Sequence, residues 1–202
     1  MEEGEDVTTV DMEPAALGIL PAYFRYADAC RLVPERRLRA MVRDGLIMQI
    51  GHGTYRKSSV DADDDLADIV LKSSSATICL VSALVRHDLS DENPAAIDIA
   101  VPRSSWAPIT RAPVVWHQFD RATFDVGRTT LEITSGVVIG LYTPERTIID
   151  AYRLAHLEGV EVAHEALRRW VRRGGQPSSL LTMAASFPRA LPAVRGALEV
   201  LL

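Results

Sequence analysis

Apolar residues recur at the spacing of one helix face in residues 34–44, PERRLRAMVRD. Pro34 favours a helix start because its φ is already helical and its missing N–H is not needed there. At 100° per residue, Leu38, Met41 and Val42 share one face. The opposite face carries one small residue and three arginines: Arg36, Arg39, Ala40 and Arg43. The apolar face is predicted to pack on a core, and the arginine face to remain exposed toward a negatively charged ligand.

Two short apolar segments follow this helix and predict a hairpin. Gly45 stands where a helix ends on a residue that tolerates the αL conformation. Residues 46–50 (LIMQI) and 54–57 (TYRK) predict strands joined by a tight turn at His52. Upstream, residues 14–20 and 26–32 have the length and pattern of short helices. This order predicts a winged helix-turn-helix. The alternative is a small three-helix unit whose arginines only form a solvated face.

The pattern after residue 65 predicts a larger second domain. A helix is expected at residues 66–71 and a buried helix at 76–89, where nearly every position is apolar. Strands are predicted at residues 95–101, 114–119, 124–126, 129–134 and 137–142. Helices are predicted at residues 144–157, 160–173, 179–185 and 191–202. The expected fold class is therefore α+β, with an N-terminal winged helix-turn-helix and a C-terminal α+β domain that has a mostly antiparallel sheet and terminal helices.

Charge divides the chain at the same places. Residues 1–20 carry six acids and no Lys or Arg, whereas residues 21–57 carry eight Lys or Arg against three acids. Residues 58–202 carry fourteen against eighteen, which completes the net charge of −5. A basic module flanked by acidic sequence suits an anionic partner such as nucleic acid. The expected domains are a disordered segment 1–12, the winged domain 13–57, a polar linker 58–65 and the C-terminal domain 66–202.

Candidate chemical groups in the chain do not form a known catalytic pattern. Cys30 and Cys79 lack CxxC or Cys/His spacing, so both are expected to be buried free thiols. Asp98 and Glu132 resemble the paired carboxylates of a metal-dependent nuclease, but Thr134 stands where such enzymes carry a lysine. The five histidines show no zinc-ligand spacing. We therefore expect a protein without catalytic activity, bound metal or cofactor. An acidic N-terminus and the lack of a long apolar run lead us to expect no membrane association and a cytoplasmic location.

Two predicted helices of the C-terminal domain carry charged residues near one end. In residues 143–150, TPERTIID, Thr143 is expected to cap a helix that begins at Pro144. Arg146 and Asp150 stand four residues apart, the spacing of an ion pair on one helix face. The helix at residues 160–173 ends with four arginines: Arg168, Arg169, Arg172 and Arg173. They either compensate the helix dipole or form a patch for an acidic partner.

Two segments resemble a known family in the same order. Residues 24–56, with RRLR at 36–39, GLI at 45–47 and GHGTY at 51–55, resemble the N-terminal domain of AbiEi-type antitoxins. These are the repressor halves of bacterial type IV toxin–antitoxin pairs. Residues 142–151, YTPERTIIDA, are similar to a segment of that family's C-terminal domain. The resemblance implies negative autoregulation at the protein's own promoter and neutralisation of a co-transcribed toxin with a nucleotidyltransferase fold.

A winged helix of this kind would use its arginines in two ways. Arg36, Arg39 and Arg43 are expected to reach guanine edges, and Ala40 to allow close approach. Other basic residues are expected to contact phosphates: Arg37, His52, Arg56 and Lys57. The arginines at the end of the predicted helix at residues 160–173 are the expected contact with the toxin: Arg168, Arg169, Arg172 and Arg173. The alternative function is a stand-alone transcriptional regulator whose C-terminal domain senses a ligand or dimerises. The third candidate function is that of a metal-dependent nuclease.

Overall fold

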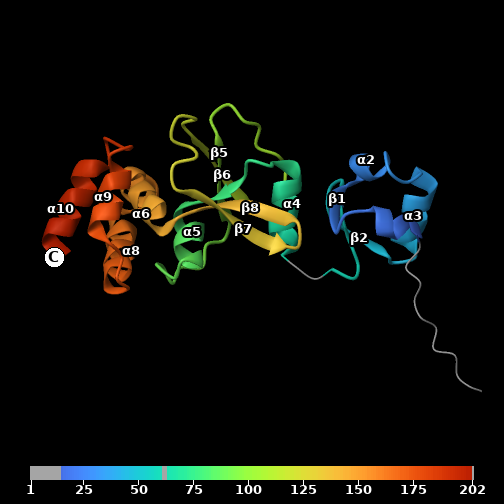
Figure 1. The fold of residues 1–202 in the computed structure, drawn as a ribbon, viewed down its shortest axis with the longest axis horizontal. Coiled ribbons are helices and arrows are strands. Elements are labelled where there is room, and N and C mark those ends of the chain that lie inside the picture. Colours follow the sequence, from blue (N-terminus) through green and yellow to red (C-terminus); the bar gives the residue numbers. More distant parts are fainter. Residues whose placement is uncertain (1–14, 61–62, 202) are drawn as a thin grey trace, which may run out of the picture. The chain divides into compact units, whose positions relative to one another are not determined.

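The computed structural model describes residues 15–60 and 63–201 (Figure 1), so the segment 1–12, expected to be disordered, lies outside the described residues. The protein is an α+β structure that divides into two compact units, residues 1–61 and 62–202. The division falls inside the segment expected to be a linker, and a helix begins at Asp64. Within the described ranges, no helix combines the length and apolarity that a membrane span requires.

The first unit packs three helices on a small sheet. Its elements are α1 (Ala15–Ile19), β1 (Tyr23–Arg25), α2 (Tyr26–Ala29), α3 (Glu35–Arg43), β2 (Ile47–Gly51) and β3 (Thr54–Lys57). The sheet has the order β1-β3-β2, and both pairs are antiparallel. Gly45 (φ +74°) ends α3, and Gly53 (φ +73°) closes the β2–β3 turn, as the hairpin pattern requires. The helix and hairpin predicted at residues 34–57 are therefore present.

Four sequence-based predictions for this unit were incomplete or wrong. Residues 23–25 form β1, whose aromatic Tyr23 and Phe24 are buried against β3. The helix expected at residues 26–32 is a single turn, α2, and residues 30–32 form a turn after it. Cys30 was expected to be buried and is exposed. Val42 was expected on the buried face of α3, yet its side chain is 38% exposed.

The second unit contains a five-stranded sheet and seven helices among its described residues. They are α4 (Asp64–Lys72), β4 (Thr77–Ile78), α5 (Leu80–Arg86), β5 (Ile97–Pro102), β6 (Val114–Phe119), β7 (Arg128–Thr134), β8 (Val137–Tyr142), α6 (Pro144–Arg153), α7 (Ala155–Glu158), α8 (Val160–Arg172), α9 (Pro177–Ala184) and α10 (Leu191–Leu201). Helices α6, α8, α9 and α10, orange to red in Figure 1, lie together beside the sheet and share one core with α5.

The prediction of a mostly antiparallel sheet was wrong, because the sheet is mixed. Its order is β6-β5-β4-β8-β7. The pairs β4–β5 and β7–β8 are antiparallel, whereas β4–β8 and β5–β6 are parallel. The central strand β4 has only two residues, and it was predicted to be part of a helix over residues 76–89. Thr77 and Ile78 are β-branched and pair with strands on both sides, so the helix α5 begins only at Leu80.

Residues 124–126 were predicted to be a strand and instead form a turn. Their carbonyl groups are used by buried side chains rather than by a neighbouring strand. The Tyr142 hydroxyl donates to the Phe124 carbonyl at 2.9 Å. A guanidinium nitrogen of Arg146 donates to the carbonyls of Thr123 and Val126. The turn therefore supplies acceptors to a buried polar cluster on α6.

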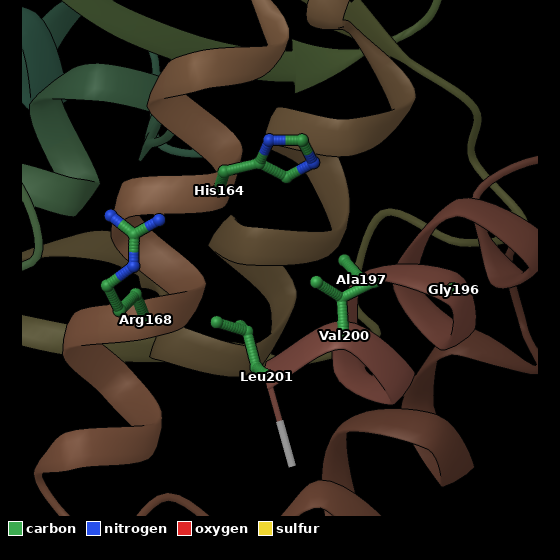
Figure 2. A pocket seen from close by; sticks show the side chains of 6 residues that line it. All are labelled: His164, Arg168, Gly196, Ala197, Val200 and Leu201. Carbon is green, nitrogen blue, oxygen red and sulfur yellow. The ribbon is translucent and has the colours of Figure 1, made fainter.

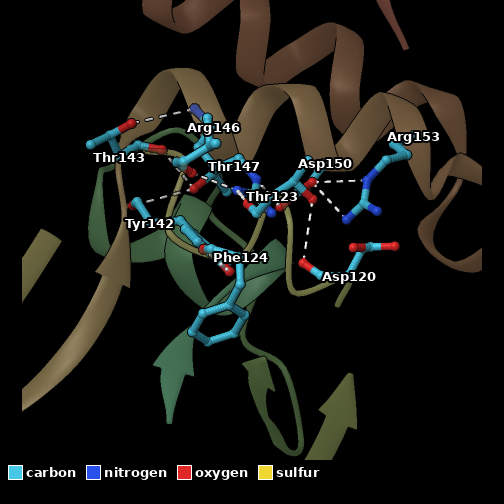
Figure 3. Close-up of polar contacts among 10 residues, drawn as sticks. Asp120, Thr123, Phe124, Tyr142, Thr143, Arg146, Thr147, Asp150 and Arg153 are labelled. Carbon is cyan, nitrogen blue, oxygen red and sulfur yellow. Dashed lines mark hydrogen bonds and ion pairs between the residues drawn. The ribbon is translucent and has the colours of Figure 1, made fainter. Parts of the chain in front are cut away.

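This cluster explains the TPERTIID segment (Figure 3). Thr143 caps α6 by accepting from the Arg146 backbone N–H, as predicted. The predicted ion pair is also confirmed: Arg146 Nε lies 2.8 Å from Asp150 Oδ2, and both side chains are 0% exposed. Arg153 approaches the other oxygen of the same carboxylate at 2.8 Å. The Arg146 guanidinium lies over the rings of Tyr142 and Phe187, at 4.2 and 4.5 Å from their centroids. The segment thus joins helix, turn and helical layer.

Two buried tyrosines near this cluster should respond oppositely to loss of the hydroxyl. Among the described residues, no hydrogen-bond partner lies within reach of Tyr152 Oη, whereas Tyr142 Oη donates to Phe124. Tyr152→Phe should therefore raise the free energy of unfolding by about 1 kcal/mol, and Tyr142→Phe should lower it by a similar amount. Urea denaturation of both variants measures this. A loss of stability in Tyr152→Phe equal to that in Tyr142→Phe would contradict the assignment.

Tyr152 also makes the folding stability depend on pH. Burial raises the pKa of Tyr152 to about 12 from a usual value of 10.0. Between these values the unfolded chain ionises this phenol and the folded chain does not, so folding stability falls as the pH rises. Tyr152→Phe should lose less stability than the wild type between pH 10 and pH 12, as measured by urea denaturation at each pH.

Candidate nucleic-acid interface

Helix α3 has one buried face and one exposed face because its sequence is strongly amphipathic. Leu38 is 0% exposed, and Met41 is buried beside it in the core of the first unit. The helix ends as the Gly45 N–H donates to Val42 O and the Leu46 N–H to Met41 O. The arginines on the other face are all exposed. Packing of the apolar face therefore fixes the helix on the core, and its basic face remains exposed to solvent.

A shallow depression of about 510 Å³ runs along this exposed face. Its lining residues are Glu35, Arg36, Arg39, Ala40 and Arg43. The structure thus brings together four of the residues that the sequence singled out on this helix. Ala40 is half-buried and has the smallest side chain of the five, so a ligand can approach the helix backbone there. Glu35 was not predicted to belong to the site.

Two of these arginines are held by carboxylates within the same short segment. Arg39 Nη2 lies 2.6 Å from Glu35 Oε1, one helical turn away. Hydrogen bonding to Glu35, and then to Tyr26, raises the pKa of Arg39 above its usual value. Arg43 Nε lies 3.0 Å from Asp44 Oδ1. All four side chains of these pairs are more than half exposed, so the pairs orient the arginines without removing them from solvent.

The hairpin places the remaining predicted basic residues differently. His52 is exposed at the β2–β3 turn, and Arg37 is exposed on α3 but does not line the depression. Lys57, half-buried, ends β3. Arg56 was expected on phosphate, but its Nη1 donates to the carbonyls of Lys57, Ser58 and Val60. Its side chain therefore holds the chain after β3 in place.

The arginines at the end of α8 lie among acids of the second unit. Arg168 pairs with Glu165 at 2.7 Å, and Arg169 pairs with both Glu165 and Asp91. Arg173 lies 3.6 Å from Asp88 and donates to the His87 carbonyl. Three of the four arginines predicted to bind a partner are thus already balanced by carboxylates.

A groove of about 340 Å³ lies between α8 and α10 (Figure 2). Its lining is mainly apolar: Gly196, Ala197, Val200 and Leu201 from α10, with His164 and Arg168 from α8. His164 also contacts the ring of the buried Tyr152, with 5.6 Å between ring centroids. The groove has the size of a small-ligand site and a cationic side chain at its border.

The carboxylates that resembled a nuclease pair are kept apart by the sheet. Asp98 lies on β5 and Glu132 on β7, and strands β4 and β8 separate them. With neighbouring strands about 4.8 Å apart, the two residues cannot share a metal ion. Asp98 is instead bonded to Ser82 and to His117 Nε2, at 3.3 and 2.8 Å. Over the described ranges, no group of three or more potential metal ligands occurs.

Comparison with known proteins gives a similarity of fold. No protein-family model matches the chain, and no curated protein matches it. The crystal structure of the RV2827C protein from Mycobacterium tuberculosis is similar, with a TM-score of 0.51 and 15% sequence identity. The match covers 92% of this chain and 78% of that one. At this identity the likeness supports the α+β fold alone.

Proposed function

We propose that the first unit is a winged helix-turn-helix domain that binds double-stranded DNA. The observation that carries the proposal is the α3 face, on which Arg36, Arg39 and Arg43 surround Ala40 in one open depression. A helix of this kind can enter the major groove, where arginine donates two hydrogen bonds to guanine. The β2–β3 hairpin follows the helix at once, in the position of a wing that reaches the phosphate backbone.

We also propose that the whole chain is a repressor-antitoxin. The support is the resemblance of residues 24–56 and 142–151 to AbiEi-type antitoxins. In this proposal the protein represses its own promoter in the cytoplasm and counteracts a co-transcribed toxin with a nucleotidyltransferase fold. It has no catalytic activity and needs no cofactor. The second unit would supply the toxin-binding surface.

A stand-alone transcriptional regulator is the second candidate. The groove between α8 and α10 favours it, because a small ligand bound there could alter the helical layer. The two candidates share the DNA-binding surface and differ in the partner of the second unit. A neighbouring gene for a nucleotidyltransferase would favour the antitoxin.

Co-expression with the product of the adjacent reading frame tests the antitoxin proposal. The chain should restore growth to cells that express this product and should repress a reporter placed behind its own promoter. A variant with Arg36, Arg39 and Arg43 replaced by alanine should lose repression and still restore growth. Loss of both activities in a variant that melts like the wild type would contradict the proposal that the first unit binds DNA and the second unit binds the toxin. Repression by the wild type without any protection would favour the stand-alone regulator.

A further inference from the structure

Glu35 is unusual on a surface proposed to meet DNA. Of the five side chains that line the α3 depression, it alone is acidic. Double-stranded DNA carries one negative charge for about every 1.7 Å of its axis. A carboxylate at this position therefore weakens general attraction to DNA, so its presence in the depression calls for a compensating role.

The geometry gives Glu35 a position from which it can contact bases. It is the first residue of α3, and the N-terminal residues of a recognition helix are those that reach base edges. Glu35 and Arg39 are one helical turn apart on the same face and are joined at 2.6 Å through Oε1 and Nη2. Their side chains are 54% and 74% exposed, so Glu35 Oε2 and the exposed part of the Arg39 guanidinium, which also bonds to Tyr26, can face a ligand.

We propose that Glu35 and Arg39 act as one unit that reads neighbouring guanine and cytosine edges in the major groove. This inference rests on the proposed DNA binding of α3. Guanine presents the acceptors N7 and O6, which suit Arg39, and cytosine presents the N4 amino donor, which suits a carboxylate. The ion pair orients the arginine before binding, and the carboxylate rejects bases that offer an acceptor in place of the amino group. Glu35 thus exchanges general affinity for preference for a G·C pair.

A purely structural role for Glu35 leads to a different expectation. An acid in the first turn is favourable at the positive end of a helix, and an intrahelical pair with Arg39 adds a small stabilisation. In that case Glu35→Gln would lower the melting temperature slightly and leave the sequence preference unchanged. Sequence preference is therefore the quantity to measure.

The experiment selects bound duplexes from a random library with the full-length wild type and two variants at one salt concentration. Glu35→Gln removes the charge from the depression and keeps the side-chain length. Asp28→Asn is the matched control, since it removes the same charge from an exposed carboxylate of the same unit. Asp28 pairs with Arg31 at 3.3 Å, and neither residue lines the depression. Affinities for the selected and for random duplexes are then measured for each protein.

We expect the wild type to select a motif with a required G·C pair, and Asp28→Asn to select the same motif. Glu35→Gln should bind random DNA a few-fold more tightly, since a repulsive charge is gone. Its discrimination at that pair should fall by about 5-fold to 100-fold, the range for one good base contact. Arg39→Lys, which keeps the positive charge but cannot donate the two parallel bonds, should lose the guanine preference as well.

Two outcomes overturn the inference and are distinguishable. If Glu35→Gln and Arg39→Lys fold and select the wild-type motif, DNA binding stands and the reading role of the pair is wrong. If the wild type selects no motif and its duplex affinity does not fall with salt, the proposed function of α3 fails and the inference fails with it.

Discussion

Replacing Asp150 by alanine should lower the free energy of unfolding by about 3–5 kcal/mol, as expected when one partner of a buried ion pair is removed. The change leaves Arg146 fully buried without its carboxylate and deprives Arg153 of the same partner. Arg146 is further held by two ring faces and by backbone carbonyls, so it cannot turn toward solvent without dismantling the turn at residues 123–126. Urea denaturation of the full-length protein measures the loss.

The chain contains a matched exposed cluster that serves as the control. Glu165 pairs with Arg168 and Arg169 at the spacings i+3 and i+4, and Asp150 pairs with Arg153 and Arg146 at i+3 and i−4. The side chains of Glu165 and Arg168 are 41% and 45% exposed. Glu165→Ala should therefore lower the free energy of unfolding far less than Asp150→Ala does. Equal costs for the two substitutions would show that burial of the Asp150 cluster contributes little.

Helix α3 and the β2–β3 hairpin could be predicted because their signals are local. Pro34 and Gly45 mark the ends of α3, and Gly53 marks the hairpin turn, each through its own backbone preference. The face of α3 follows from the order of residues along one helix. Strand β1 was missed because three residues are too few for a periodic pattern, and they become a strand only by pairing with β3.

The sheet of the second unit could not be predicted because its order depends on distant partners. Thr77 and Ile78 lie in a long apolar run that also suits a helix, and only pairing with β5 and β8 selects the strand. Phe124 lies in a segment with strand-like residues, but its carbonyl is bound by a tyrosine eighteen positions later. Local propensity carries no information about either partner.

The candidate site shows the same division. The arginines of α3 were found from periodicity, whereas Glu35 was missed because an acid in a first turn already has a role at the helix end. The use of Arg56 could not be foreseen, since its acceptors are backbone carbonyls of the segment that follows β3. Arg169 and Asp91 are seventy-eight positions apart, so the balance of charge at the end of α8 is visible only in the folded chain.

Replacing Arg36, Arg39 and Arg43 together by alanine should reduce affinity for the protein's promoter DNA at least about a hundredfold. Each arginine that reads a base is worth about 1–3 kcal/mol, and a phosphate contact contributes about 0.9 to the slope of log affinity against log salt. The triple variant should therefore also bind with a smaller salt dependence. Fluorescence anisotropy with a labelled promoter duplex at several salt concentrations measures both quantities.

A second triple variant separates this surface from general positive charge. Replacing Arg168, Arg172 and Arg173 by alanine changes the net charge by the same amount, but these residues lie on or just after α8 in the second unit. Affinity and salt slope should then stay close to those of the wild type. Random duplex DNA adds a further distinction, because base-reading arginines affect the promoter more than random sequence, whereas phosphate contacts affect both equally. An equal loss of affinity in the two triple variants would mean that basic residues spread over the surface attract DNA and that α3 does not bind in the groove.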